Sequence, residues 1–106
     1  MAEVPEPVQT ALDAANAGDT DAFLATFADD GAVDDWGRVF RGHDAVRGWS
    51  DAEFIGKRVT LDVTGVRSDG TTIVVSAQVG GDGFNGPSDF AFEVVEGRVA
   101  LMTISG

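Results

Sequence analysis

The sequence has no cysteine and no tyrosine, and its 106 residues include a single lysine, Lys57, and a single histidine, His43. Without cysteine the chain has no disulfide, no zinc–thiolate site and no thiol nucleophile. No apolar run approaches the roughly 18 residues that a membrane-spanning helix needs. The first residues have neither the positive charge nor the apolar stretch of a secretory signal peptide. We therefore expect a cytoplasmic protein.

Positive charge is also scarce, because 7 Lys and Arg residues stand against 18 Asp and Glu residues and give a formal net charge of −11. A surface of this sign repels nucleic-acid phosphates and anionic lipid headgroups. We expect no nucleic-acid partner and no membrane partner. The aspartates lack the spacing of a calcium loop and no histidine pair exists, so we also expect no metal and no cofactor.

Helical signals fill the first half of the chain, which we interpret as one domain over residues 1–106. Apolar residues at helical spacing predict a first helix that starts near Val8 and ends at Gly18. Asp19 is placed as the N-cap of a second helix, which we expect to end at residues 29–31.

Strand signals fill the second half. Short strands are predicted at residues 32–36 and 38–41, and a third helix opens at residues 42–44. From residue 59 onward, alternating apolar and β-branched residues predict consecutive strands joined by tight turns, with Asn85-Gly86 as the strongest hairpin signal. This order predicts an α+β fold in which an antiparallel meander carries its helices on one face.

The order of several short motifs resembles the nuclear transport factor 2-like superfamily, and within it the SnoaL-like proteins. The residues that carry the resemblance are Asn16-Ala17-Gly18-Asp19, Phe27-Ala28-Asp29-Asp30, Val33-Asp34-Asp35 and Phe40-Arg41-Gly42-His43-Asp44-Ala45-Val46 with Trp49. The resemblance implies a cone-shaped, curved antiparallel sheet packed on three N-terminal helices, a cystatin-like α+β roll. That superfamily includes isomerases, dehydratases, cyclases and non-catalytic binding proteins, so the resemblance is specific for the fold rather than for a reaction.

The resemblance also implies a pocket between helices and sheet with a carboxylate at its edge. Asp34 and Asp35 are the candidates, and adjacent strand residues point to opposite faces, so one of them is expected to face inward. The run Val33-Asp34-Asp35 resembles the ketosteroid isomerase stretch that holds the proton-shuttling base, which assigns the base to Asp35. The isomerases' oxyanion-binding tyrosine falls on Ala11, and their second donor falls on Ser88 or Asp89.

Several other side chains are pocket candidates, although aromatic residues of this kind also form ordinary cores. The candidates are Asp34, Trp36, Trp49, Phe54, Phe90, Phe92, Ser88 and Asp89. Two functions remain open: a domain that binds a small apolar metabolite, and a cofactor-free isomerase, cyclase or dehydratase that uses Asp35 as general base. No lysine lies near Asp35 in the sequence, so we expect a pocket-facing Asp35 to be desolvated and Asp35→Asn to stabilise the fold slightly near pH 7.

The late strands carry apolar residues at both parities, as at Ile73, Val74 and Val75. A strand that is apolar on both faces has to bury both, and helices cover only one. We therefore expect a homodimer formed through the outer face of the sheet.

Overall fold

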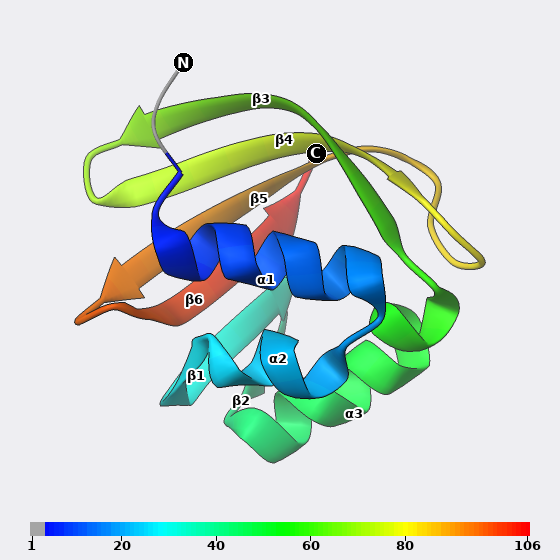
Figure 1. Cartoon of the computed structure of the whole chain (residues 1–106), viewed down its shortest axis with the longest axis horizontal. Helices are drawn as coiled ribbons and strands as arrows, with labels where there is room; N and C mark the ends of the chain where they lie inside the picture. The colour runs from blue at the N-terminus through cyan, green and yellow to red at the C-terminus, as the bar shows by residue number, and fades with distance from the viewer. Residues whose placement is uncertain (1–3) are drawn as a thin grey trace.

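The computed structural model describes residues 4–106 and contains three α-helices, one short 3₁₀ helix and six strands (Figure 1). In chain order they are α1 (Glu6–Ala17), α2 (Thr20–Ala25), β1 (Phe27–Asp35), β2 (Arg38–Arg41), α3 (His43–Glu53), η1 (Ile55–Lys57), β3 (Thr60–Asp69), β4 (Thr72–Gly80), β5 (Gly86–Val95) and β6 (Arg98–Ser105). The predicted α+β architecture is confirmed, with the helices on the concave side of one curved sheet.

The two N-terminal helices end and begin where the sequence predicts. Gly18 adopts a left-handed conformation (φ 71°) after α1, and its N–H donates to the last carbonyls of the helix. Only a residue without a Cβ takes this C-cap position without strain. The carboxylate of Asp19 accepts a hydrogen bond of 3.1 Å from the backbone N–H of Ala22 and caps α2.

The predicted end of the second helix at residues 29–31 is wrong, because α2 stops at Ala25 and β1 begins at Phe27. The hydroxyl of Thr26 donates to the Phe23 carbonyl at 2.7 Å, while the Thr26 carbonyl accepts from Val99 at 2.8 Å. Pairing with a distant strand therefore overrides the local helical pattern.

The six strands lie in the order β2-β1-β6-β5-β4-β3. Four of the five neighbouring pairs are antiparallel, and β3 to β6 form the predicted meander. The exception is β1, which pairs in parallel with β6, with Asp35 opposite Ile104. The sheet is therefore mixed rather than wholly antiparallel, since the early hairpin β1–β2 joins it beside the last strand.

The connection between β4 and β5 also differs from the prediction. Asn85-Gly86 does not form a two-residue turn; residues 81–85 make a longer loop and Gly86 is the first residue of β5. The loop is held against η1, because the Asp82 N–H donates to the Lys57 carbonyl at 2.8 Å. Asn85 stabilises the loop from inside by donating to the carbonyls of Gly81 and Gly83.

The core lies between the helices and the concave face of the sheet. Its largest fully buried side chains are Phe23, Phe27, Phe90, Phe92 and Met102. A tilted contact between Phe23 and Phe54, with ring centroids 5.5 Å apart, joins α2 to the end of α3. This packing fixes the C-terminal end of α3 over the sheet, where the candidate site lies.

The free edge of β3 is tied to α1 by one side chain. The Asn16 amide accepts from the Leu61 N–H at 2.6 Å and donates to the Leu61 carbonyl at 3.0 Å, so it occupies both backbone groups as a neighbouring strand would. Within residues 4–106, none of the helices has the length and apolar character needed to cross a membrane.

Candidate functional site

A pocket of about 370 Å³ opens between the end of α3, the β1–β2 turn and the β4–β5 loop. Figure 1 shows the β4–β5 loop at the right. Ligand sites commonly have volumes of about 300–1,000 Å³. The lining side chains are mostly apolar and aromatic, with four charged groups. They come from Asp35, Trp36, Arg38, Trp49, Glu53, Phe54, Lys57, Val59, Val79, Gly80, Gly83, Phe84, Ser88, Phe90 and Ile104.

The tight turn between β1 and β2 places the first group of site residues. Asp35 pairs with Arg38 across the hairpin, and the two residues between them, Trp36 and Gly37, have φ values of 54° and 90°. Positive φ at both positions is typical of a type I′ turn, whose twist matches that of the flanking strands. The turn leaves the Trp36 side chain 63% exposed at the rim of the pocket.

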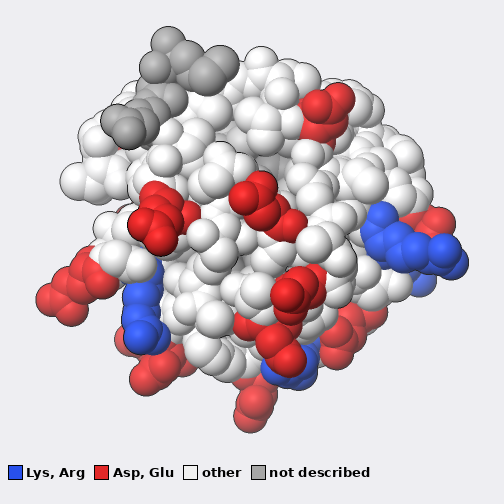
Figure 2. All heavy atoms as spheres, viewed as in Figure 1, with Lys and Arg blue, Asp and Glu red and all other residues white. Residues whose placement is uncertain are grey.

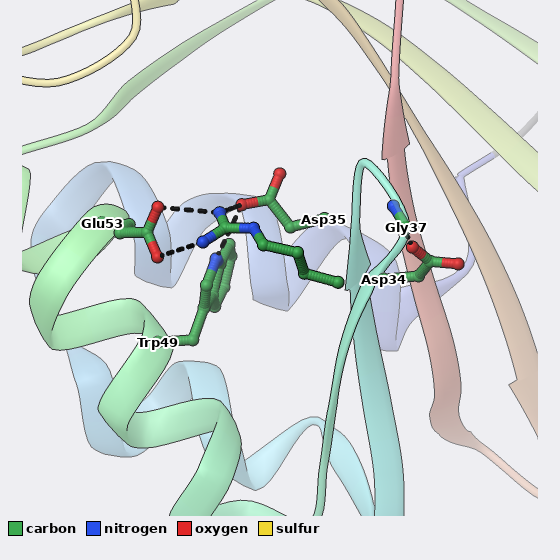
Figure 3. Close-up of polar contacts among 6 residues, drawn as sticks. Asp34, Asp35, Gly37, Trp49 and Glu53 are labelled. Atoms are coloured by element: carbon green, nitrogen blue, oxygen red, sulfur yellow. Dashed lines mark hydrogen bonds and ion pairs between the residues drawn. The ribbon is translucent and has the colours of Figure 1, made fainter.

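Asp34 and Asp35 point to opposite faces of β1, as their adjacency predicts. Asp35 lines the pocket and its side chain is only 15% exposed. Asp34 lies outside the pocket, where its carboxylate accepts a 2.8 Å hydrogen bond from the Gly37 N–H and supports the turn (Figure 3). The candidate role of Asp34 in the pocket is therefore wrong.

Arg38 bridges the two acidic residues of the pocket (Figure 3). Its guanidinium donates to Asp35 Oδ2 at 2.6 Å and to both carboxylate oxygens of Glu53, at 2.8 and 3.0 Å. The indole Nε1–H of Trp49 donates to the same Oδ2 atom at 3.0 Å. Arg38 therefore supplies the positive charge that no nearby lysine provides, because the hairpin brings it to Asp35 from the neighbouring strand.

These contacts shift the ionisation of the partly exposed groups. The hydrogen bonds that Arg38 donates to Glu53 and Asp35 raise its pKa, so its guanidinium stays charged. The hydrogen bond from Arg38 holds the pKa of Glu53 below its ordinary value of 4.5. Because the folded pKa of Glu53 is the lower one, its contribution to stability is present above about pH 4.5 and is lost as the pH falls further.

The second oxygen of Asp35 is free. Oδ1 accepts no hydrogen bond from residues 4–106, and Figure 3 shows it pointing away from Trp49 and Glu53. Ser88, on β5, also lines the pocket; the residue is 5% exposed and its hydroxyl makes no hydrogen bond within the described part of the chain. The pocket therefore presents one fixed carboxylate with a free acceptor and one hydroxyl among apolar walls.

Most of the predicted site residues meet in this pocket. The candidates that line it are Asp35, Trp36, Trp49, Phe54, Phe90 and Ser88. Phe92 does not, because it lies deeper on β5 and is 1% exposed in the core. Asp89 has the opposite parity to Ser88 and accepts a 2.6 Å hydrogen bond from Ser76 instead. Of the two positions left open for a second donor, Ser88 is the one in the pocket.

Two charged lining residues escaped the sequence analysis. Glu53 lies one helical turn after Trp49 on α3, and this i, i+4 spacing was the signal that could have found it. Lys57 lies on η1. It is the only lysine of the chain, and this was the signal that could have drawn attention to it.

Two other polar side chains, His43 and Arg41, contact backbone carbonyls of the β1 segment. His43 places Nε2 3.1 Å from the Phe27 carbonyl, and Arg41 donates to the Asp30 carbonyl at 3.0 Å. Ala11, at the position of the isomerases' tyrosine, is buried in the core and lies outside the pocket lining. No group of three or more His, Asp or Glu side chains within residues 4–106 is placed to hold a metal ion.

The SnoaL-like domain family matches residues 8–102 of the chain. A putative polyketide cyclase from Sinorhizobium meliloti is similar in structure, with 30% identity, a TM-score of 0.85 and coverage of 96% of this chain and 95% of that one. A protein from Sphaerobacter thermophilus is 26% identical, with a TM-score of 0.78 and coverage of 94% and 92%.

A third structural relative was solved with a ligand. It is a Mycobacterium tuberculosis protein in complex with estradiol-17beta-hemisuccinate, at 20% identity, with a TM-score of 0.79 and coverage of 92% of this chain and 88% of that one. At this identity the similarity establishes the shared fold. No curated protein sequence matches the chain.

Proposed function

Because this chain belongs to the SnoaL-like domain family, we propose that it is a binding domain for a small, largely apolar molecule held in the pocket beside Asp35. The observation that carries the proposal is the combination of apolar walls with the free Oδ1 atom of Asp35. An apolar pocket with a few fixed polar groups is the usual form of a small-molecule site, because the walls supply affinity and the polar groups supply orientation. A ligand hydroxyl or amide N–H donates to Oδ1 in this arrangement.

The ion pair with Arg38 favours binding over catalysis. The Arg38 guanidinium holds Oδ2 at 2.6 Å, which suits Asp35 to the role of a fixed hydrogen-bond acceptor. Trp49 and Arg38 both hold Oδ2, so the carboxylate is oriented before a ligand enters. Such preorganisation lowers the entropic cost of binding.

Phe84→Ala tests the pocket without disturbing the core, because Phe84 lines the mouth and is 58% exposed. We expect the apolar fluorescent probe N-phenylnaphthylamine to bind the wild-type protein, with saturable fluorescence enhancement. The variant loses apolar contact worth about 1 kcal/mol, so its Kd should rise about fivefold. Val95→Ala is the matched control, since Val95 is also 58% exposed but lies outside the pocket lining. Equal affinity in all three proteins would contradict the proposal.

Acid–base chemistry at Asp35 is the second candidate function, and the free Oδ1 atom supports it. In this reaction Oδ1 removes a proton from a carbon next to a ligand carbonyl, and Ser88 is the available donor for the developing oxyanion. Deuterium uptake next to the carbonyl of an apolar cyclic ketone, followed by NMR, tests it. Catalysed exchange that disappears in Asp35→Asn supports a base; no exchange above background in the wild type contradicts it.

We also propose a homodimer formed through the outer face of the sheet. Val74 lies on that face, outside the core cluster to which Val75 and Ala77 belong, although it is already buried within the single chain. Leu101 has the parity opposite to the core residue Met102, which places a second apolar side chain on that face. Met102 and Ile104 belong to the core, so the apolar area of the outer face is smaller than the sequence indicates.

Light scattering tests the dimer. The outer face also carries carboxylates such as Asp89, and two copies bring like charges together, so association should strengthen as salt screens them. We expect a dimer mass at tens of micromolar protein in molar sodium chloride, and a monomer for Leu101→Asp under the same conditions. A monomeric wild type at both low and molar salt would exclude the dimer.

A further inference from the structure

Lys57 is placed in the pocket wall by its backbone. The residue ends η1, and its carbonyl accepts the hydrogen bond from Asp82 that holds the β4–β5 loop. Its side-chain stem lies along Gly83, where an added methyl group would come within 3.3 Å of the Lys57 Cβ and Cγ atoms. The stem is therefore packed against the loop, and Lys57 is one of the residues that line the pocket.

The Lys57 ammonium group has no counterion within the described residues, 4–106. Within residues 4–106 no carboxylate lies within 4.0 Å of it, although arginines elsewhere form ion pairs, as Arg58 does with Asp82 at 3.0 Å. The acidic residues of the pocket lining are Asp35 and Glu53, and Arg38 binds both. The lining thus contains two carboxylates that share one guanidinium, and a separate cation, Lys57, that forms no ion pair within the described residues.

The rest of the surface makes this cation unusual. Carboxylates are scattered over the face shown in Figure 2, and Lys and Arg side chains lie toward its edges. In a chain of net charge −11, an anion in solution meets repulsion at most of the surface. The pocket differs because its two acidic side chains are neutralised in part by Arg38, and Lys57 adds a positive charge beside apolar walls.

We propose that the pocket selects amphipathic anions, with the apolar body of the ligand among the aromatic side chains and its carboxylate, sulfonate or similar group bound by Lys57. The inference rests on the proposed binding function and adds the charge class of the ligand. A cationic ligand fits less well, since the Arg38 guanidinium already occupies the positions at which Asp35 and Glu53 bind a positive group. The Lys57 ammonium contributes a point charge with three donors, which suits a compact anionic group.

Two probes with the same ring system test the charge class: anilinonaphthalene sulfonate, which carries a sulfonate, and N-phenylnaphthylamine, which lacks it. Their Kd values are measured by fluorescence titration with the wild type, Lys57→Met and Arg98→Met. Arg98, at the start of β6, lies outside the pocket lining and forms no ion pair within the described chain. Lys57→Met and Arg98→Met each remove one positive charge, so both change the net charge from −11 to −12. Arg98→Met therefore controls for the loss of long-range attraction.

We expect Lys57→Met to raise the Kd of the sulfonate probe about three- to tenfold, the range between an exposed ion pair and a charge-assisted hydrogen bond. The Kd of the neutral probe should change less than about twofold, and Arg98→Met should affect neither probe. If both probes bind but Lys57→Met weakens neither, or Arg98→Met weakens the sulfonate probe equally, the inference is wrong and the binding function stands. If neither probe binds the wild type, the binding function itself is wrong.

Discussion

Gly56→Ala should destabilise the protein by about 3 kcal/mol, the upper end of the usual cost of overpacking. A Cβ atom at this position would lie 1.7 Å from the Asp51 carbonyl oxygen and 2.5 Å from the carbonyl carbon. These are backbone atoms of α3, so no side-chain rotation relieves the clash, and the turn from α3 into η1 has to move. Phe54 and Lys57 lie within two residues of Gly56 and both line the pocket, so probe affinity should fall together with stability.

Gly48→Ala is the matched control for this substitution. Gly48 lies in the exposed middle of α3, and a Cβ atom there meets nothing within 4 Å. Alanine loses less backbone entropy on folding than glycine, so this variant should gain about 0.5–1 kcal/mol. Urea unfolding of both variants measures the difference. A Gly56→Ala protein within about 1 kcal/mol of the wild type would show that the η1 turn is far more adaptable than its packing indicates.

Asp35→Ala should cost about 2 kcal/mol, because it removes the acceptor of a buried donor. Trp49 is 4% exposed, and its indole N–H donates to Asp35 Oδ2. Without the carboxylate this N–H is buried with no partner, and the Arg38 guanidinium loses one of its two anions. Asp35→Asn keeps an acceptor for Trp49 and loses only the charge, so it should cost less, about 1 kcal/mol.

Asp34→Ala provides the comparison on the other face of β1. The Asp34 carboxylate accepts from an exposed turn N–H, which water satisfies equally well, so the expected cost is about 0.5 kcal/mol. Chemical unfolding at pH 7 should therefore rank the three variants with Asp35→Ala as the least stable. A stabilising Asp35→Asn would contradict this ranking and would mean that desolvation of the carboxylate outweighs its ion pair with Arg38.

The sign of the Asp35→Asn effect illustrates what the sequence leaves open. Sequence reasoning placed Asp35 at the pocket from its parity and its motif, and the structure agrees on its position. The expected stabilisation by Asp35→Asn depends on the absence of a lysine nearby in the chain. The cationic partner is Arg38, brought opposite Asp35 by a two-residue turn, and completed by Glu53 from a helix 15 residues further on. Such a cluster depends on tertiary packing that local patterns do not encode.

The elements themselves were predicted best where the signal is local. The C-cap at Gly18, the N-cap at Asp19 and the strand that begins near residue 59 all depend on interactions between near neighbours, and each is present in the structure. The predicted alternation in burial ends at Leu61, because Val63 is exposed. The end of α2 and the parallel neighbour of β1 depend on residues about 70 positions away, around Val99, so the local pattern misassigned both.

The position of β6 inside the sheet sets the order in which the chain can fold. The strand lies between β5 and β1, so residues 27–35 have no sheet neighbour on that side until residues 99–104 are available. Contacts of such sequence separation require closure of a long loop, which slows folding. The hairpins β3–β4 and β4–β5 can form early, because their strands are adjacent in the sequence. The segments α1, α2 and β1 instead have to wait for β6, and until then apolar side chains such as Phe27 stay exposed to solvent. During synthesis, the N-terminal half is therefore the part of this protein that depends on protection from aggregation.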